Sequence, residues 1–332
     1  MWYFGGMCSR VWLLAAGVAT LSAQHPVYLI SQKAESSIAF YTPAGEKLAA
    51  VPVGRHPHEM ALSPDGRYLY TTDNGTMRIE EAGTGGNTIS IVDVLARRKV
   101  GEISLGNFRR PHGIDLDPAS GRLAVTTELP DQLLLIDPAA RKVLRTYDTK
   151  GKTSHMVKLG AGAKWAYVSN SNSANVSAIN LETGEVTLIH TGDRPEGGVV
   201  SRNGRYFYVG NRDGNSIAEI DTRTQKLGGQ IQSGKGSVRM AMTPDGRRLV
   251  YALYHENFVE VADPRAKRVV SRIALPDHVV SLNLSRDGKL AFASAEEKDT
   301  VFVVSLPEQK VVRTIHTAKG AGPDPVMEIA AP

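Results

Sequence analysis

The chain has 332 residues, with 39 Lys and Arg against 34 Asp and Glu, and a formal net charge of +5 at neutral pH. The basic excess forms no long run of lysine or arginine, so a nucleic-acid-binding protein is not indicated. Cys8 is the only cysteine and precedes the expected mature chain, which excludes disulfides, thiolate metal ligands and cysteine nucleophiles from that mature chain.

The first 23 residues are typical of a signal peptide. Arg10 is followed by an apolar run from Val11 to Leu21, and Leu21-Ser22-Ala23 supplies a small residue at the cleavage point. The run is about half the length that a membrane-spanning helix needs, and no comparable run follows it. We therefore expect cleavage after Ala23, a periplasmic or secreted protein, and no transmembrane segment in the mature chain. A retained N-terminal anchor is the alternative.

The mature chain repeats one pattern seven times. In each copy a strand ends near Asp, a second strand follows, and a third begins after Pro or Ser and leads through a Pro-Asp-Gly-like turn to a fourth. The copies begin 41 to 51 residues apart, at Ile38, Ile89, Leu133, Val176, Ile217, Val259 and Val301. Such copies, rich in β-branched and aromatic residues, predict an all-β fold, namely a seven-bladed β-propeller of four-stranded antiparallel blades.

The two ends of the mature chain supply complementary parts of one blade. The segment 325–332 matches 57–64 in register, and the chain stops where the next strand should follow. Val27 to Ser31 offers that strand. We therefore expect residues 24–332 to form a single propeller domain whose ring is closed by N- and C-terminal strands in a shared blade, which leaves no long free edge.

Two segments carry a resemblance to a known family. Trp165-Ala166-Tyr167-Val168-Ser169-Asn170 and Tyr206-Phe207-Tyr208-Val209-Gly210-Asn211 resemble the tyrosine-valine-threonine-asparagine repeat of the YVTN β-propellers, in the lactonase-like and cytochrome d1-like seven-bladed superfamily. The resemblance covers the whole mature chain. It implies the architecture but not one function, because related propellers include lactonases, lyases, haem and copper enzymes, and binding scaffolds.

The resemblance also implies that the strand after each Pro or Ser is the innermost one and begins at one mouth of the channel. Aligning these strands on the turns that follow them places seven residues at one equivalent position: His58, His112, His155, Glu196, Val238, Val280 and Val326. Neighbouring inner strands would point the first four at a shared volume near the axis. Imidazole and carboxylate are common ligands of divalent transition metals, so we predict His58, His112, His155 and Glu196 as ligands of zinc or copper. A metal-free ligand or catalytic site, or a purely structural role, are the alternatives.

Further polar residues are expected at the same mouth. Asp73, Glu128, Arg212 and His255 end second strands, and Arg239 follows the column position; these five are the predicted ligand-binding residues. Glu128 belongs to the blade of His112 and would orient an imidazole or act as a base. The loop between Asn74 and Asn87 is longer than its counterparts and would form a flap over the site or an exposed loop with no role.

The connections into the inner strands are basic, which favours a small carboxylated or phosphorylated ligand; they carry Arg55, Arg109, Arg110, Lys150, Lys152, Arg194 and Lys235. A solvated charged rim would look the same. The favoured function is thus an exported propeller with a site for a metal, a small anion or both, and we expect a monomer.

Two other functions fit the sequence. One is a non-catalytic scaffold that binds a protein of the cell envelope. The other is a lactonase- or lyase-like enzyme in which His112, His155, Glu196 and Arg239 polarise a small anionic substrate. No complete catalytic motif of either enzyme class maps onto the chain, so the sequence leaves enzymatic activity undecided.

Overall fold

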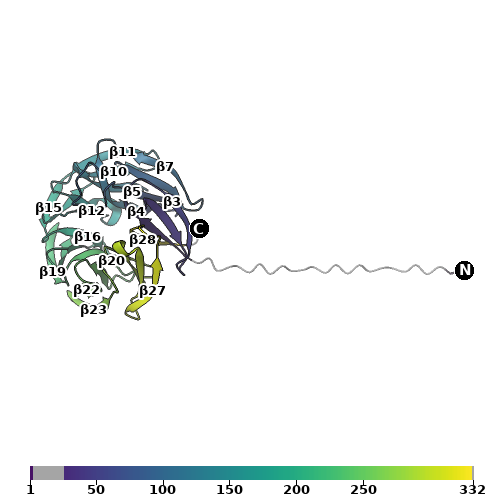
Figure 1. The fold of residues 1–332 in the computed structure, drawn as a ribbon. Coiled ribbons are helices and arrows are strands. Elements are labelled where there is room, and N and C mark those ends of the chain that lie inside the picture. The colour runs from purple at the N-terminus through teal and green to yellow at the C-terminus, as the bar shows by residue number, and fades with distance from the viewer. Residues whose placement is uncertain (3–25, 331–332) are drawn as a thin grey trace.

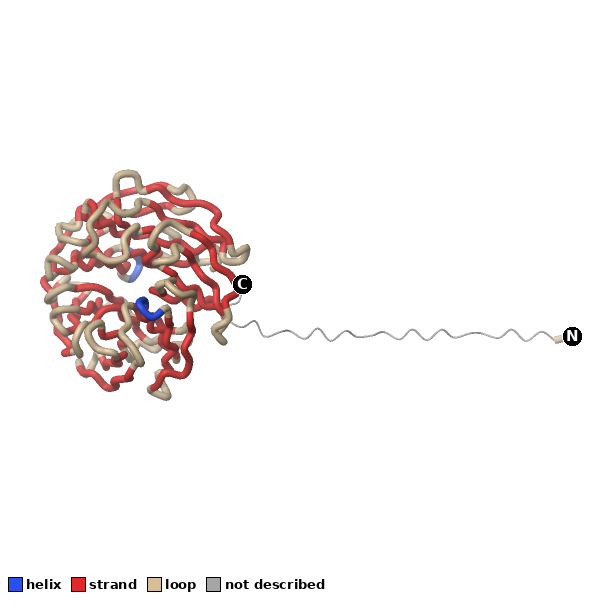
Figure 2. Tube along the Cα trace, viewed as in Figure 1, coloured by secondary structure: helices blue, strands red, loops and turns tan. Residues whose placement is uncertain are grey.

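The structure is a computed structural model that describes residues 1–2 and 26–330. Within this range 28 strands form seven antiparallel sheets of four strands, arranged as blades around a central axis (Figure 1). The helical elements of this range are two 3-10 turns, η1 (Ala161–Ala163) and η2 (Glu296–Lys298) (Figure 2). The predicted seven-bladed propeller is confirmed. The predicted signal peptide lies outside the described residues, apart from Met1 and Trp2.

From the axis outward, the strands of the first two blades are β28 (Pro323–Ile329), β1 (Val27–Gln32), β2 (Ser37–Tyr41), β3 (Lys47–Pro52), and β4 (Pro57–Leu62), β5 (Tyr68–Asp73), β6 (Thr88–Asp93), β7 (Arg98–Ser104). Those of the next two, in the same order, are β8 (Arg109–Leu116), β9 (Leu123–Leu129), β10 (Asp131–Asp137), β11 (Lys142–Asp148), and β12 (Ser154–Leu159), β13 (Trp165–Asn170), β14 (Asn175–Asn180), β15 (Val186–His190).

The remaining three blades are β16 (Pro195–Val200), β17 (Tyr206–Asn211), β18 (Ser216–Asp221), β19 (Lys226–Gln232); β20 (Ser237–Met242), β21 (Leu249–Leu253), β22 (Phe258–Asp263), β23 (Arg268–Ala274); and β24 (Ser281–Leu284), β25 (Leu290–Ala295), β26 (Thr300–Ser305), β27 (Lys310–His316). The first strand of each blade contacts the first strands of the neighbouring blades around the axis. These strands are therefore the innermost ones, as the resemblance implied.

The two termini share the first blade, as predicted. Strand β28 pairs antiparallel with β1, and Leu29 lies opposite Met327 while Ile30 lies opposite Val326. Leu29, Ile30 and Val326 are buried. Because β1 would otherwise present an unpaired inner edge, this pairing closes the ring.

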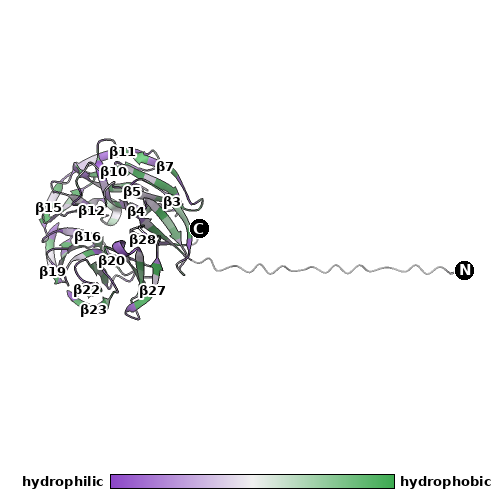
Figure 3. Ribbon diagram, in the orientation of Figure 1, coloured by the Kyte–Doolittle hydropathy of each residue, from purple (hydrophilic) through white to green (hydrophobic). Residues whose placement is uncertain are grey.

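The apolar core lies between the faces of adjacent blades. Strands in the second and third positions are buried on both faces because a neighbouring blade covers each of them, as in β6 and β13, where all residues but the first are buried. The outermost strands expose most of their residues, and β11 buries only Tyr147. Apolar residues consequently recur along the strands all around the ring (Figure 3). None of the helical segments in the described range is long and apolar enough to span a membrane.

Candidate metal centre at the channel mouth

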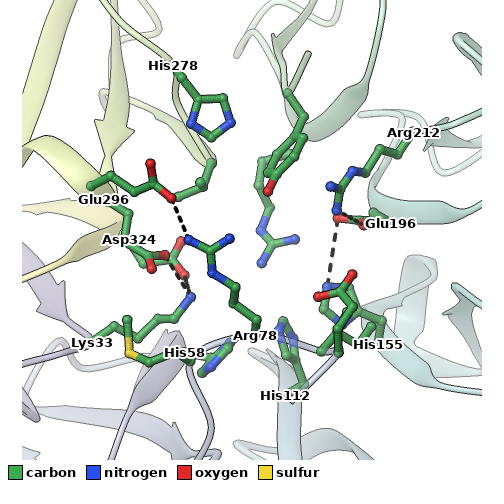
Figure 4. A pocket seen from close by; sticks show the side chains of 17 residues that line it. Lys33, His58, Arg78, His112, His155, Glu196, Arg212, His278, Glu296 and Asp324 are labelled. Carbon is green, nitrogen blue, oxygen red and sulfur yellow. Dashed lines mark hydrogen bonds and ion pairs between the residues drawn. The ribbon is translucent and has the colours of Figure 1, made fainter.

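The histidine column lies at the start of consecutive inner strands. His58, His112, His155 and Glu196 belong to β4, β8, β12 and β16, and all four side chains are buried. They line one pocket of about 90 Å³ at the mouth of the channel (Figure 4). The space admits a few water molecules or a hydrated ion and is well below the roughly 300–1,000 Å³ of sites for drug-sized ligands.

Two backbone features aim these side chains at the axis. The ladder register shifts at the column position in β4, β8, β12, β16 and β20, for example between Pro57 and Met60. Such bulges re-aim side chains and are common beside functional sites. In addition, the residue two positions before the column is left-handed in four blades, where it is His56, Arg110, Thr153 or Arg194. Non-glycine residues rarely adopt this conformation, so the tight approach to each inner strand is built into the mouth.

A hydrogen-bonded relay fixes the tautomers of two histidines. His58 Nε2 lies 2.8 Å from the carbonyl oxygen of Thr76, which can only accept, so His58 Nε2 carries the proton. In a neutral ring His58 Nδ1 is then an acceptor, and His112 Nε2, 2.8 Å away, donates to it. His112 Nδ1 is left with an unprotonated lone pair. This buried nitrogen has no hydrogen-bond partner among the described residues.

Burial keeps both imidazoles uncharged at neutral pH. The pKa of His112 is held well below its ordinary value by burial first and then by the neighbouring His155 and His58. The pKa of His58 is lowered by burial and by the charge of Lys33. Since neutral imidazole is the form that binds metals, the site is prepared for ligation without loss of a proton.

His155 lies between two carboxylates. Its Nδ1 is 3.5 Å from Glu128 Oε1, and its Nε2 is 3.9 Å from Glu196 Oε2. His112, Glu128 and His155 each offer a ligand atom within 4.8 Å of the other two. The geometry therefore groups Glu128 with the two histidines, whereas the sequence had pointed to His58 and Glu196 as the further ligands.

Arginine side chains hold both carboxylates in place. Arg110 Nε lies 2.9 Å from Glu128 Oε2, in a buried ion pair. Glu196 Oε1 accepts from Arg212 Nη1 at 3.2 Å and from Arg194 Nε at 3.3 Å. Burial alone would raise the pKa of Glu196, but the charges of His155, Arg212, Arg239 and Arg194 together lower it. Glu196 is therefore an anion at neutral pH.

The long loop after β5 covers the pocket. Met77, Arg78, Ile79 and Glu80 contribute to its lining. Arg110 fastens the loop by donating to the carbonyl oxygens of Ile79 and Glu81, each at 2.9 Å, and more distantly to that of Arg78. Arg78 also pairs with Glu297, and Glu80 with Arg194. The loop thus takes the flap position that was one of its two predicted arrangements.

A second buried charge cluster forms another side of the pocket. Lys33 Nζ lies 3.0 Å from both Glu296 Oε2 and Asp324 Oδ2, and Figure 4 shows this triad away from His155 and Glu196. The pocket as a whole is lined by four cationic side chains and five carboxylates, which are Lys33, Arg78, Arg212 and Arg239, and Glu80, Glu196, Glu296, Glu297 and Asp324. Because the carboxylates balance the cations, the lining has no positive excess, in contrast to the basic rim expected from the sequence.

The other predicted ligand-binding residues divide into two groups. Arg212 and Arg239 line the pocket, where Arg239 Nη2 pairs with Glu59 Oε1 at 2.7 Å. Asp73 and His255 are not among the lining residues. The buried Asp73 carboxylate accepts from the Gly54 amide and from the Thr88 and Ser90 hydroxyls within its own blade. His255 is exposed and lies near Asp213.

Four residues of the site were not predicted as site residues: Lys33, Glu59, Arg110 and Asp324. Glu59 follows His58 just as Arg239 follows Val238, and the bulge turns both residues of such a pair toward the mouth. Asp324 lies two positions before Val326 of the column, so the alignment of inner strands carried a signal for it. Arg110 appeared only as one of several rim cations, and nothing in the sequence marked Lys33.

Comparisons with known proteins agree with this architecture. Residues 119–330 match the DUF5074 family, a domain of unknown function. The chain is 26% identical over 280 residues to the seven-bladed beta-propeller protein Rv1057 of Mycobacterium tuberculosis (strain ATCC 25618 / H37Rv), an alignment that covers 80% of this chain. The chain spans 64% of the length of that relative.

Three solved structures share the fold at low sequence identity. A functionally unknown protein from Desulfotomaculum acetoxidans DSM 771 superposes with a TM-score of 0.75 at 16% identity, covering 92% of this chain and 99% of the other. Kuenenia stuttgartiensis hydrazine synthase gives 0.67 at 19%, covering 93% and 99%. Dihydro-heme d1 dehydrogenase NirN, in complex with DHE, gives 0.66 at 14%, covering 91% and 74%. These similarities establish the seven-bladed propeller of the type that the repeats resembled, and the fold alone.

Proposed function

Since the chain belongs to the DUF5074 family, whose function is unknown, we propose its function from the site: it is a propeller that binds a divalent transition metal at the channel mouth. His112, Glu128 and His155 are the proposed ligands, and zinc or copper the proposed metals. The observation that carries the proposal is the cluster of these three buried residues, with ligand atoms within 4.8 Å of one another.

The relay through His58 supports the choice of His112. Metal-binding histidines usually donate their second ring N–H to a fixed acceptor, which sets the tautomer and the orientation of the ring. His58 Nδ1 is that acceptor, and it leaves His112 Nδ1 as an unpaired lone pair in a buried position. A buried nitrogen without a partner costs free energy that a metal bond would remove. We therefore assign His58 to positioning rather than to ligation.

The two carboxylates have different proposed roles. Glu128 would bind the metal through Oε1, while Arg110 holds its Oε2. His155 would then ligate through Nδ1, and its Nε2 would donate to Glu196, which two arginines already hold in place. Such outer partners typically contribute 10–100-fold to metal affinity.

The charge of the lining favours a cation over a free anion. With five carboxylates against four cationic side chains, the pocket has no excess of positive charge to attract an anion by itself. Three protein ligands leave an open coordination position on a metal such as zinc. A small carboxylated or phosphorylated molecule enters the proposal there, as a ligand of the metal.

Metal titration of the purified protein tests the proposal. After treatment with EDTA, zinc should bind with a stoichiometry of one per chain by isothermal titration calorimetry. The variant His112→Ala/His155→Ala should lose this binding and keep the circular dichroism spectrum of the wild type, because mouth residues contribute little to packing between blades. The exposed His190 and His316 provide a matched control, since His190→Ala/His316→Ala should bind zinc normally.

Either of two results would contradict the assignment, namely absence of zinc binding by the wild type or retention of one zinc by the His112→Ala/His155→Ala variant. The first result would favour the alternative of an envelope scaffold without a metal. Hydrolysis of a lactone panel by the zinc-loaded protein, lost in the same variant, would instead support the lactonase-like alternative.

We also propose that residues 24–332 form the exported mature protein. The support is the short apolar run from Val11 to Leu21 followed by Ser22 and Ala23. Mass spectrometry of protein from the periplasm or the medium should find Gln24 as the N-terminal residue. A dominant mature chain that keeps the apolar run would oppose the proposal.

A further inference from the structure

A second cavity lies at the opposite end of the blades, away from the channel mouth. It has a volume of about 610 Å³ and opens between the blade β4–β7 and the blade β8–β11. Tyr68, Tyr70, Ile91 and Val100 form its apolar side, and the turn between β10 and β11, which contains Arg141, forms the other. Its volume falls in the range of sites for small organic ligands.

The repeat provides an internal template for this cavity. Three blades further around the ring, between β16–β19 and β20–β23, a smaller cavity of about 350 Å³ is lined by Tyr208, Glu219 and Lys267. There the Tyr208 hydroxyl donates to Glu219 Oε2 at 3.0 Å, and Lys267 Nζ lies 3.1 Å from Glu219 Oε1. A buried carboxylate thus joins a tyrosine of one blade to a cation of the next.

The two cavities correspond residue by residue. Tyr70 pairs with Ile91, and Ile91 with Gly101, as Tyr208 pairs with Glu219, and Glu219 with Gly229. Arg141 and Lys267 are both left-handed residues of the turn that enters the outermost strand, with φ of 53° and 51°. Each cation lies against the equivalent glycine, and each donates to the carbonyl oxygen of the residue before that glycine, Val100 or Gly228. The correspondence makes Ile91 the counterpart of Glu219.

The replacement of glutamate by isoleucine leaves two donors without an acceptor. The side chain of Tyr70 is buried, with the residue 6% exposed, and its hydroxyl has no hydrogen-bond partner among residues 26–330. Arg141 has no carboxylate partner in the same range, and its one hydrogen bond is the long 3.4 Å contact to Val100. Both line the larger cavity. A tyrosine hydroxyl and a guanidinium that face one apolar space are the donors that a carboxylate accepts from.

We propose that this cavity is a binding site for a small organic carboxylate. The ligand's carboxylate takes the place that the Glu219 carboxylate occupies in the equivalent cavity, between the Tyr70 hydroxyl and the Arg141 guanidinium. Its apolar body lies against Ile91, Val100 and Tyr68. The site is independent of the proposed metal, which binds at the other end of the blades.

Ligand-observed NMR titrations with benzoate and octanoate, in the presence of EDTA, test this proposal. At least one of the two acids should bind, and which of them binds better reports whether the apolar body is aromatic or aliphatic. Benzamide and octanamide, the uncharged counterparts, should bind at least about tenfold more weakly, since a hydrogen bond to a charged group contributes about that factor or more.

Matched variants locate the binding. Arg141→Gln, which introduces the residue type found at the equivalent position 225, should weaken binding at least about tenfold. Lys267→Gln in the template cavity should leave it unchanged. Ile91→Glu should also abolish binding, because it supplies the missing carboxylate from the chain itself.

The proposal fails if neither acid binds, if the amides bind as tightly as the acids, or if Arg141→Gln binds like the wild type. Arg141 is exposed, so its replacement is not expected to affect folding. That variant keeps the test decisive even if glutamate at the buried position 91 prevents folding.

Discussion

Replacement of Asp73 by asparagine should remove a defined pH dependence from the stability of the propeller. Asp73 is 1% exposed, and burial raises its pKa to about 6 from an ordinary 3.8, although three hydrogen bonds from Gly54, Thr88 and Ser90 oppose the shift. Asn170 and Asn211 occupy the equivalent position in other blades, so the fold accommodates asparagine there.

The sign and the size follow from proton linkage. Between about pH 4 and pH 6 the folded state keeps the Asp73 proton while the unfolded state has released it, so the free energy of unfolding falls as the pH rises. This is the reverse of the usual carboxylate, whose pKa is lowered on folding. A difference of about two pKa units corresponds to about 3 kcal/mol, complete above about pH 6.

Urea unfolding followed by circular dichroism, from pH 4 to 7.5, measures the effect in Asp73→Asn and the wild type. Other titrating groups affect both proteins alike, so the difference between their free energies of unfolding isolates Asp73. Relative to the wild type, the variant should gain about 3 kcal/mol as the pH rises through this range. A difference that stays constant with pH would show that burial does not raise the pKa of Asp73.

Three further changes have expected outcomes. Deletion of residues 325–332 should cost at least about 3–6 kcal/mol by exposing the contacts of Val326 and Ile329, seen as a large fall in Tm; an unchanged Tm would contradict closure of the ring by the termini. Arg110→Lys keeps the charge beside Glu128 but loses the bonds to the flap, so trypsin should cleave after Arg78 several-fold faster, whereas equal cleavage rates would show that Arg110 does not hold the loop. Glu128→Gln should weaken zinc binding more than Glu196→Gln, and the opposite order would exchange their proposed roles.

The repeat pattern was enough to predict the architecture and the place of the site. Equivalent positions on inner strands are related by the rotation of the ring, so aligning the strands on their turns brought His58, His112, His155 and Glu196 to one pocket. The long loop after β5 was likewise marked by its spacing, although its position over the mouth depends on Arg110.

The pairing of charges could not be predicted in the same way. Whether an arginine faces solvent or a carboxylate depends on rotamers and on the left-handed residues before each inner strand, which a linear pattern does not contain. Arg110 and Arg194 therefore looked like a basic rim, although each pairs with buried acids. Asp73 was expected at the site because it ends β5, but hydroxyls of its own blade engage its carboxylate.

Crystallographic location of zinc tests the central proposal most directly. A crystal of the metal-loaded protein, measured on both sides of the zinc absorption edge, should give one strong anomalous peak per chain. We predict this peak about 2.0–2.2 Å from His112 Nδ1, His155 Nδ1 and a Glu128 oxygen. A peak among Lys33, Glu296 and Asp324 instead, or no peak at the mouth, would contradict the proposal.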